Sequence, residues 1–250
     1  TMMNQLREQA ERFGTKVEVD FISRVEFSKE KGGVHKIYTQ NGDEIQSKAI
    51  IICTGASAKY LGLPSEQKLI GGGVSACAVC DGFFYKDQDV AVVGGGDSAI
   101  EEATYLAKIC TNVTMLVRKD HFRASKAMQH RLSNFKNINV LFNSEIDEVL
   151  GDNVVEGIKI KNNITNEFSQ VNITGLFLAI GHTPNTDIFK GIVDMDDSGY
   201  ILTDKTSTKT NIPGVFAAGD VQDKDYRQAI TAAGTGCMAA LDAERYLQEI

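Results

Sequence analysis

The chain alternates between short apolar runs and longer stretches in which apolar residues recur at helical spacing. Apolar positions at three- and four-residue steps predict a helix over residues 3–13, and Gly14 supplies its stop. Further helices are expected over residues 97–109, 125–135 and 228–247. Strands are expected over residues 48–53, 90–93, 113–117, 138–142, 176–180 and 215–218. This alternation of strands and helices is typical of an α/β protein.

Other stretches have the two-residue period of half-buried strands. Residues 17–22, 24–27 and 34–39 alternate, and Asn41-Gly42 is a strong hairpin signal. Residues 145–160 begin a second antiparallel meander, which an alternating stretch further along the chain continues. By contrast, residues 48–53 are apolar almost without interruption, which predicts a strand buried on both faces.

Composition and charge are those of an ordinary globular protein. The 250 residues are 42% hydrophobic and carry a net charge of −7, so nothing favours nucleic acid or an anionic membrane as a partner. No apolar run approaches the roughly 20 residues of a membrane span. Only one pair of the five cysteines is close in sequence, which favours a reducing, cytoplasmic compartment. We expect Cys53, Cys110 and Cys237 to be small core residues.

The close pair is Cys77-Ala78-Val79-Cys80, and the acid Asp81 follows it directly. Two cysteines at this spacing can close a small disulfide ring, and their thiol pKa values are commonly lowered. The alternatives are half of a zinc site or two unrelated buried cysteines. No second pair stands at zinc spacing. The pair follows residues 59–73, which contain glycines and a proline and are a linker candidate.

A glycine-rich loop follows the strand expected at residues 90–93. It has the pattern G-x-G-x-x-A between a strand and a helix, which is typical of a dinucleotide site. The loop residues expected to bind the cofactor are Gly94, Gly95, Gly96, Asp97, Ser98 and Ala99. Gly94 makes the turn, Gly96 lets the backbone approach a pyrophosphate, and Ala99 permits close helix–strand contact. The next strand ends in Arg118-Lys119, with Arg123 shortly after, which favours the 2′-phosphate of NADPH over NADH.

The last predicted strand ends in Gly219-Asp220, and Arg227-Gln228-Ala229 opens the final helix. An acid at a strand's carboxyl end can bind the hydroxyls of a ribose or ribityl chain, and helix amides can face a ring carbonyl. The alternative is that Asp220 merely caps the helix.

Together these motifs resemble the low-molecular-weight thioredoxin reductases, which are pyridine nucleotide–disulfide oxidoreductases that use NADPH and FAD. The resemblance runs the length of the chain in order. It is carried by Thr54-Gly55-Ala56, Cys77 to Gly82, Gly94 to Ala99, the basic residues at 118–123, Gly181-His182-Thr183-Pro184-Asn185, residues 214–221 and residues 227–246.

The resemblance implies an α/β fold with two Rossmann-like, three-layer nucleotide-binding domains. Residues 60–179 would form the NADPH domain that carries the cysteine pair, inserted into an FAD domain of residues 1–59 and 180–250. It further implies that Cys77 and Cys80 form the redox disulfide and that Asp81 protonates a departing thiolate. The FAD site would include Thr54, Gly55, Ala56, Gly219, Asp220, Arg227, Gln228 and Ala229.

Two departures from the family pattern stand out. Val117-Arg118-Lys119 replaces the usual His-Arg-Arg, which largely keeps the charge. Family members also begin with their own strand–G-x-G-x-x-G–helix for the FAD pyrophosphate, and no such motif precedes Cys77. We therefore expect the sequence to be part of a longer one. A natural truncation, which would remove that phosphate site, is the alternative.

The implied function is the transfer of electrons from NADPH through FAD to the Cys77–Cys80 disulfide and on to thioredoxin. A cytoplasmic homodimer is expected, with the NADPH domain rotating about residues 59–73 and 179–183. One alternative is a related flavoprotein that uses NADH and a peroxiredoxin-linked acceptor. Another is a non-catalytic NADPH-binding fragment.

Overall fold

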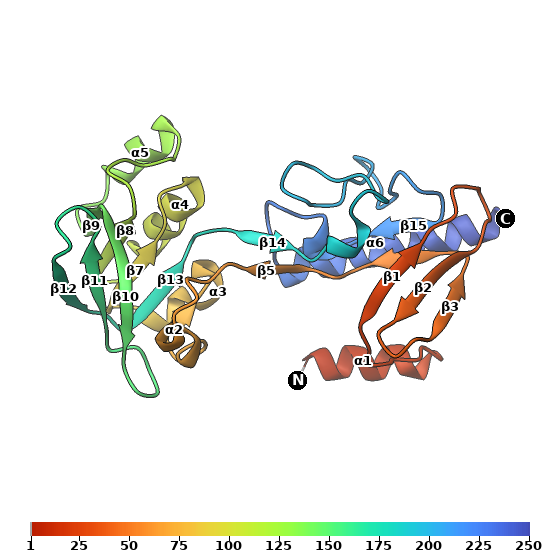
Figure 1. The fold of residues 1–250 in the computed structure, drawn as a ribbon, viewed down its shortest axis with the longest axis horizontal. Helices are drawn as coiled ribbons and strands as arrows, with labels where there is room; N and C mark the ends of the chain where they lie inside the picture. Colours follow the sequence, from red (N-terminus) through yellow and green to blue (C-terminus); the bar gives the residue numbers. More distant parts are fainter. Residues whose placement is uncertain (1) are drawn as a thin grey trace. The chain divides into compact units, whose positions relative to one another are not determined.

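The computed structural model describes residues 2–250, and they fall into two compact units. Ser57–Thr183 form one unit, called the inner unit because it interrupts the other in sequence. The outer unit comprises the residues up to Ala56 together with Pro184–Ile250 (Figure 1). Two short strands that pair with each other, β5 (Ala56–Ala58) and β14 (His182–Pro184), lie at the two crossings between the units.

The inner unit is built on a five-stranded parallel sheet. Its order is β6-β13-β7-β8-β9, so the strand that opens the glycine loop, β7, is central. The strands are β6 (Val74–Ser75), β7 (Asp89–Val93), β8 (Asn112–Val117), β9 (Ile138–Phe142) and β13 (Gly175–Leu178).

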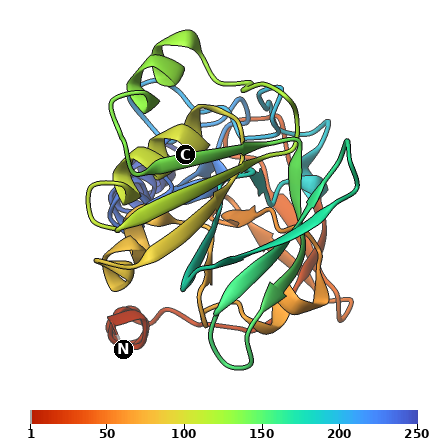
Figure 2. The same ribbon diagram turned by 90° about the vertical axis from the view of Figure 1, so that its left-hand side faces the viewer.

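Both faces of this sheet are covered, which makes three layers (Figures 1 and 2). Val90 and Val92 of β7 point into a core shared with helix α4 (Asp97–Leu106). Ala91 and Val93 point into a second core with the antiparallel meander β10-β11-β12. Burial on both faces explains the unbroken apolar run of this strand. The remaining elements are β10 (Ser144–Leu150), β11 (Gly157–Asn162), β12 (Phe168–Asn172), α2 (Pro64–Lys68), α3 (Ala78–Asp81), η1 (Gly82–Tyr85) and α5 (Lys126–Leu132).

The sequence suggested that residues 59–73 are a linker, but in the structure they are folded into the inner unit. They include α2, and Leu69 is only 1% exposed in the core beneath the meander. The carboxylate of the fully buried Glu66 accepts hydrogen bonds from the backbone N–H groups of Leu61 and Gly62, at 2.9 and 2.8 Å. A helix of one turn is too short to show periodicity, which is why the pattern of apolar positions did not reveal it.

The outer unit has a parallel strand pair at its centre, β4 (Ile50–Ile52) and β15 (Val215–Ala217). The long helix α6 (Ala229–Gln248) packs on one side of the pair through Ala239, Ala243 and Tyr246. The other side shares a core with β1, one strand of the antiparallel sheet β1-β2-β3. The remaining elements are α1 (Met2–Arg12), β1 (Ile22–Glu26), β2 (His35–Thr39), β3 (Glu44–Ser47), η2 (Asp187–Phe189) and η3 (Gly219–Val221).

Three expectations for the outer unit are wrong. Residues 17–21 form no strand, and Val19 is 92% exposed. Ile51 is 38% exposed, because β15 is the only strand that pairs with β4 among the described residues. Cys53 and Cys237 are exposed rather than buried. Only Cys110 is a core cysteine, and burial raises the pKa of its thiol to about 11.

Within residues 2–250, no helix combines the length and apolar character that crossing a membrane requires.

Candidate active site

Cys77 and Cys80 form a disulfide at the start of α3. Cys77 is the residue that precedes the helix, and its Sγ lies 3.2 Å from the backbone N–H of Cys80. Ala78, between them, is fully buried against α4, whereas Val79 and Cys80 are exposed. The buried alanine thus anchors the ring, while Cys80 lies at the surface. No group of three or more metal-binding side chains occurs in the described part of the chain.

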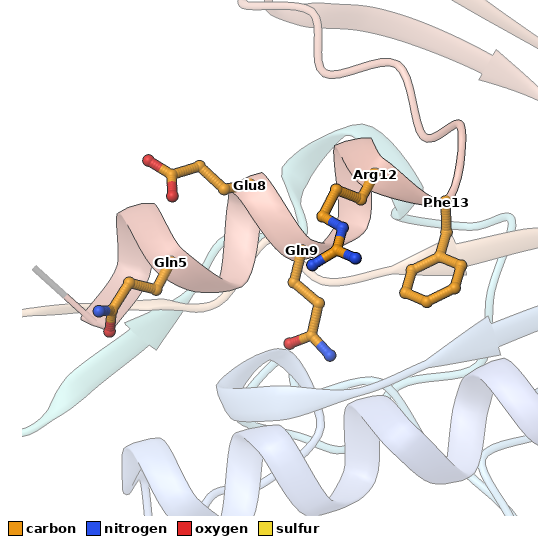
Figure 3. Close-up of a pocket in the computed structure, with 5 residues that line it drawn as sticks. All are labelled: Gln5, Glu8, Gln9, Arg12 and Phe13. Atoms are coloured by element: carbon orange, nitrogen blue, oxygen red, sulfur yellow. The ribbon is translucent and has the colours of Figure 1, made fainter.

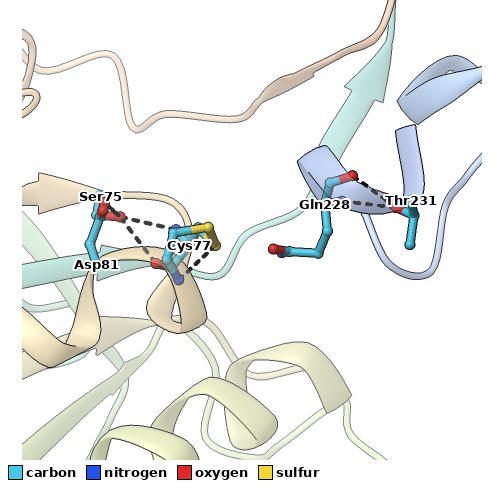
Figure 4. The surroundings of a disulfide bond; sticks show 6 residues. Ser75, Cys77, Asp81, Gln228 and Thr231 are labelled. Atoms are coloured by element: carbon cyan, nitrogen blue, oxygen red, sulfur yellow. Dashed lines mark hydrogen bonds between the residues drawn. A yellow bond between two sulfur atoms is a disulfide. The ribbon is translucent and has the colours of Figure 1, made fainter. Parts of the chain in front are cut away.

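Asp81 lies in the same helical turn and is held by Ser75. The Ser75 hydroxyl donates to Asp81 Oδ2 at 2.7 Å and accepts from the backbone N–H of Cys77 at 3.1 Å (Figure 4). One buried serine therefore connects the acid to the backbone of the disulfide. Burial raises the pKa of the Tyr85 hydroxyl, and the charge of Asp81 adds to that effect. Ser75 has no motif of its own, so the sequence offered no signal for its role.

The glycine loop, residues 94–96, connects β7 to α4 as the pattern predicted. Gly94 has φ +147°, and a Cβ there would lie 2.5 Å from the carbonyl oxygen of Ala179. A Cβ at Gly95 would lie 2.9 Å from Val117 Cγ1, so this turn closes only with glycine. Ala99 is fully buried at the helix–strand contact. The first N–H groups of α4 have no acceptor within the helix, which suits an anion.

The basic loop, residues 118–123, lies beside the glycine loop. The backbone N–H of Arg123 donates to the Gly95 carbonyl at 2.8 Å, and a Cβ at Gly96 would lie 3.5 Å from Arg123 Nη2. Arg118, Lys119 and Arg123 are all exposed. The cations and the helix terminus therefore lie on one edge of the inner unit, where a dinucleotide phosphate is bound most favourably.

Asp97 and Ser98 are exposed in the first turn of α4. Asp97 accepts a hydrogen bond from the backbone N–H of Ser125 at 2.6 Å. In this structure its carboxylate braces the loop that precedes α5.

In the outer unit, two of the predicted FAD segments follow the paired strands β4 and β15. Thr54-Gly55-Ala56 comes after β4 and Gly219-Asp220 after β15, and the backbone N–H of Ala218 donates to the Ile52 carbonyl at 3.0 Å. Because carboxyl ends of parallel strands meet at one edge, both segments lie on that edge. Gly219, at φ +75°, would place a Cβ 3.6 Å from Ala232, so α6 begins nearby.

Arg227-Gln228-Ala229 is positioned by a residue that carried no motif, Asp223. Its carboxylate accepts hydrogen bonds from four groups: the backbone N–H groups of residues 225, 226 and 227 and the Thr231 hydroxyl. Burial opposes ionisation of Asp223, but these hydrogen bonds outweigh it and lower its pKa. Gln228 and Thr231 form a reciprocal cap at the start of α6, drawn at the right of Figure 4. This bracing holds Arg227 at φ +47°.

The residues along α1 outline a separate, open hollow of about 380 Å³ (Figure 3). Its lining consists of Gln5, Glu8, Gln9, Arg12 and Phe13. None of these belongs to a predicted cofactor or disulfide site.

Comparison with known proteins decides the family. A family model described as pyridine nucleotide-disulphide oxidoreductase matches residues 2–236. A thioredoxin reductase from Rickettsia conorii is 51% identical over 251 aligned positions, which cover 99% of this chain and 80% of the relative. One from Streptomyces coelicolor is 50% identical over 98% of this chain and 76% of its own length.

The chain belongs to the thioredoxin reductase family.

Solved structures agree with this membership. The thioredoxin reductase from Giardia duodenalis has a TM-score of 0.90 at 42% identity, over 99% of this chain and 80% of its own. The one from Streptococcus pyogenes has a TM-score of 0.91 at 35% identity, over 100% and 80%. The predicted family, the Rossmann-like α/β fold and the enzyme class are thus confirmed. As a member of the thioredoxin reductase family, the protein is a flavoprotein oxidoreductase that uses NADPH and FAD.

Proposed function

We propose that this protein reduces the disulfide of a thioredoxin through its own Cys77–Cys80 disulfide. The observation that carries the proposal is the disulfide itself, with Cys80 exposed and Asp81 held beside it by Ser75. The thioredoxin reductase from Rickettsia conorii is named for the same substrate. The exposed apolar side chains Phe83 and Phe84, 70% and 76% exposed, continue this surface and suit a protein partner better than a small molecule.

Reduction of the partner runs through Cys77, Cys80 and Asp81. When bound, NADPH and FAD supply two electrons. With the single proton that the hydride of NADPH carries, these electrons would open the Cys77–Cys80 bond to one thiol and one thiolate. The thiolate attacks a sulfur of the partner's disulfide, so a mixed disulfide forms and a partner thiolate departs, which Asp81 protonates. The second cysteine passes its proton to the Asp81 carboxylate, and its thiolate attacks the enzyme sulfur of the mixed disulfide. Cys77–Cys80 forms again, and the second partner thiolate leaves and takes a proton from solvent.

The nucleotide is assigned to the inner unit and the flavin to the outer unit. The close-packed glycine loop and the adjacent basic loop fit a dinucleotide with a 2′-phosphate. In the outer unit, Asp220 and the start of α6, where Arg227, Gln228 and Ala229 lie, offer an acid and backbone amides to FAD.

We also propose that the protein forms a homodimer in the cytoplasm. Exposed apolar residues of α6, among them Ile230 and Leu241 at 80% and 46%, offer surface that a second copy would cover. The three unpaired cysteines, Cys53, Cys110 and Cys237, suit a reducing compartment.

The nucleotide assignment is tested by Arg118→Ala. Loss of a charge-assisted contact to the 2′-phosphate, about 1.5–3 kcal/mol, raises the dissociation constant of NADPH roughly 10- to 100-fold. NADH affinity stays within about twofold, because NADH lacks that phosphate. Isothermal titration of both nucleotides measures the effect.

Arg131→Ala is the matched control, since it removes an exposed arginine from the same unit, in α5. It leaves both affinities unchanged. An equal loss of NADPH and NADH binding in Arg118→Ala would refute the assignment of Arg118 to the 2′-phosphate.

A further inference from the structure

The loop that carries Arg118 and Lys119 is held in place through its backbone. The backbone carbonyls of these two residues accept the hydrogen bonds, and their charged side chains do not take part. The Arg118 carbonyl accepts from Asn163 Nδ2 at 3.3 Å, and the Lys119 carbonyl accepts from the backbone N–H of Asn143 at 3.0 Å. The backbone N–H of Asn163 in turn donates to the Asn143 carbonyl at 2.7 Å. These bonds form one connected set that leaves the charged ends of Arg118 and Lys119 in solvent.

Both asparagines stand in tight turns next to strands of the meander. Asn143 lies between β9 and β10 at φ +51°, a conformation that asparagine tolerates better than most residues. Asn163 follows β11, in a turn where the Asn162 carboxamide oxygen accepts from the N–H groups of Ile164 and Thr165. The turn is therefore braced from within, and it can hold the Arg118 carbonyl in place.

The opposite end of the basic loop is fixed separately. Arg123 and the residue after it donate to the Gly95 carbonyl at 2.8 and 3.0 Å. The ring of Phe122 packs edge-on against Phe142 of β9, with centroids 5.1 Å apart. The Arg118-Lys119 end directly follows β8, and its carbonyls are the ones that accept from the asparagines. A phosphate bound by preorganised cations does not have to order the loop first.

We propose that Asn163 is a positioning residue for recognition of the 2′-phosphate, acting with the backbone of Asn143 through the carbonyls of Arg118 and Lys119. The inference rests on the proposed nucleotide site. In this proposal, part of the selectivity for NADPH comes from the meander, which lies on the face of the sheet opposite α4. The meander itself supplies none of the cations.

The test measures NADP⁺ and NAD⁺ affinities of the full chain by isothermal titration, a readout that needs neither flavin nor turnover. Asn163→Ala removes one hydrogen bond to the loop, so it weakens NADP⁺ binding about three- to tenfold. NAD⁺ binding stays within about twofold. Asn163→Ser, a residue suited to turns whose hydroxyl is too short to reach the carbonyl, gives the same result if the alanine variant does not fold.

Gln170→Ala is the control, since it removes an exposed amide from β12 of the same meander and leaves both affinities unchanged. Unchanged NADP⁺ binding in a folded Asn163 variant overturns the proposal. An equal loss for both nucleotides overturns it too, because that result indicates a merely structural role. If the unmodified protein fails to prefer NADP⁺, the proposed nucleotide site itself is wrong, and the role of Asn163 falls with it.

Discussion

Cys80→Ser is expected to lower NADPH-dependent reduction of a thioredoxin disulfide about a thousandfold or more, to background. The remaining thiol of Cys77 cannot form the intramolecular disulfide that carries two electrons, so the route to the partner is cut. The residues proposed to bind FAD do not include Cys80, so we expect NADPH to bleach the visible flavin absorbance at the unaltered rate. Stopped-flow absorbance and an insulin-coupled thioredoxin assay measure the two reactions separately.

Cys237→Ser is the matched control for this change, because it removes an exposed, unpaired cysteine from α6. Both reactions keep their rates in this variant. If Cys80→Ser abolished flavin bleaching as well as disulfide reduction, Cys80 would be a structural residue, and the proposed electron path would be wrong.

Asp81→Asn is expected to slow disulfide exchange with the partner about a hundredfold. An amide keeps the shape of the side chain and can still bond to Ser75, but it cannot supply the proton that a departing thiolate needs. Pre-steady-state reduction of the partner, followed after the flavin has been reduced, isolates this step. Nucleotide affinity does not change, because Asp81 lies outside the glycine and basic loops.

Asp152→Asn serves as the control for charge removal, since it alters an exposed acid of the inner unit that pairs with Lys68. It leaves the exchange rate intact. An Asp81→Asn enzyme that reduced its partner at the full rate would remove Asp81 from the role of acid.

The sequence was most informative where a function needs residues close together along the chain. The cysteine pair, the glycine loop and the basic loop each occupy a few consecutive residues. The structure places the glycine loop and the basic loop at the strand ends that the pattern predicted, whereas the one-turn helix α3 at the cysteine pair was not predicted. Ser75 and Asp223 escaped because their roles come from hydrogen bonds that form only once β6 and the start of α6 are in place. A lone serine or aspartate has no spacing to recognise.

Burial was harder to predict than element type. The apolar run that contains Ile51 was expected to be buried on both faces, yet β4 pairs with a single strand among the described residues. Cys53 comes directly after that strand and is exposed as well. Apolar character records what a residue tolerates, whereas exposure depends on which other segments pack against it.

The most direct test of the account is an anaerobic titration of the flavin-loaded protein and an oxidised thioredoxin with NADPH. We expect two new thioredoxin thiols for each NADPH consumed, and alkylation during turnover to label Cys77 and Cys80 but not Cys110. Consumption of NADPH without new thiols, or reduction of thioredoxin while Cys77 and Cys80 stay unlabelled, would contradict it.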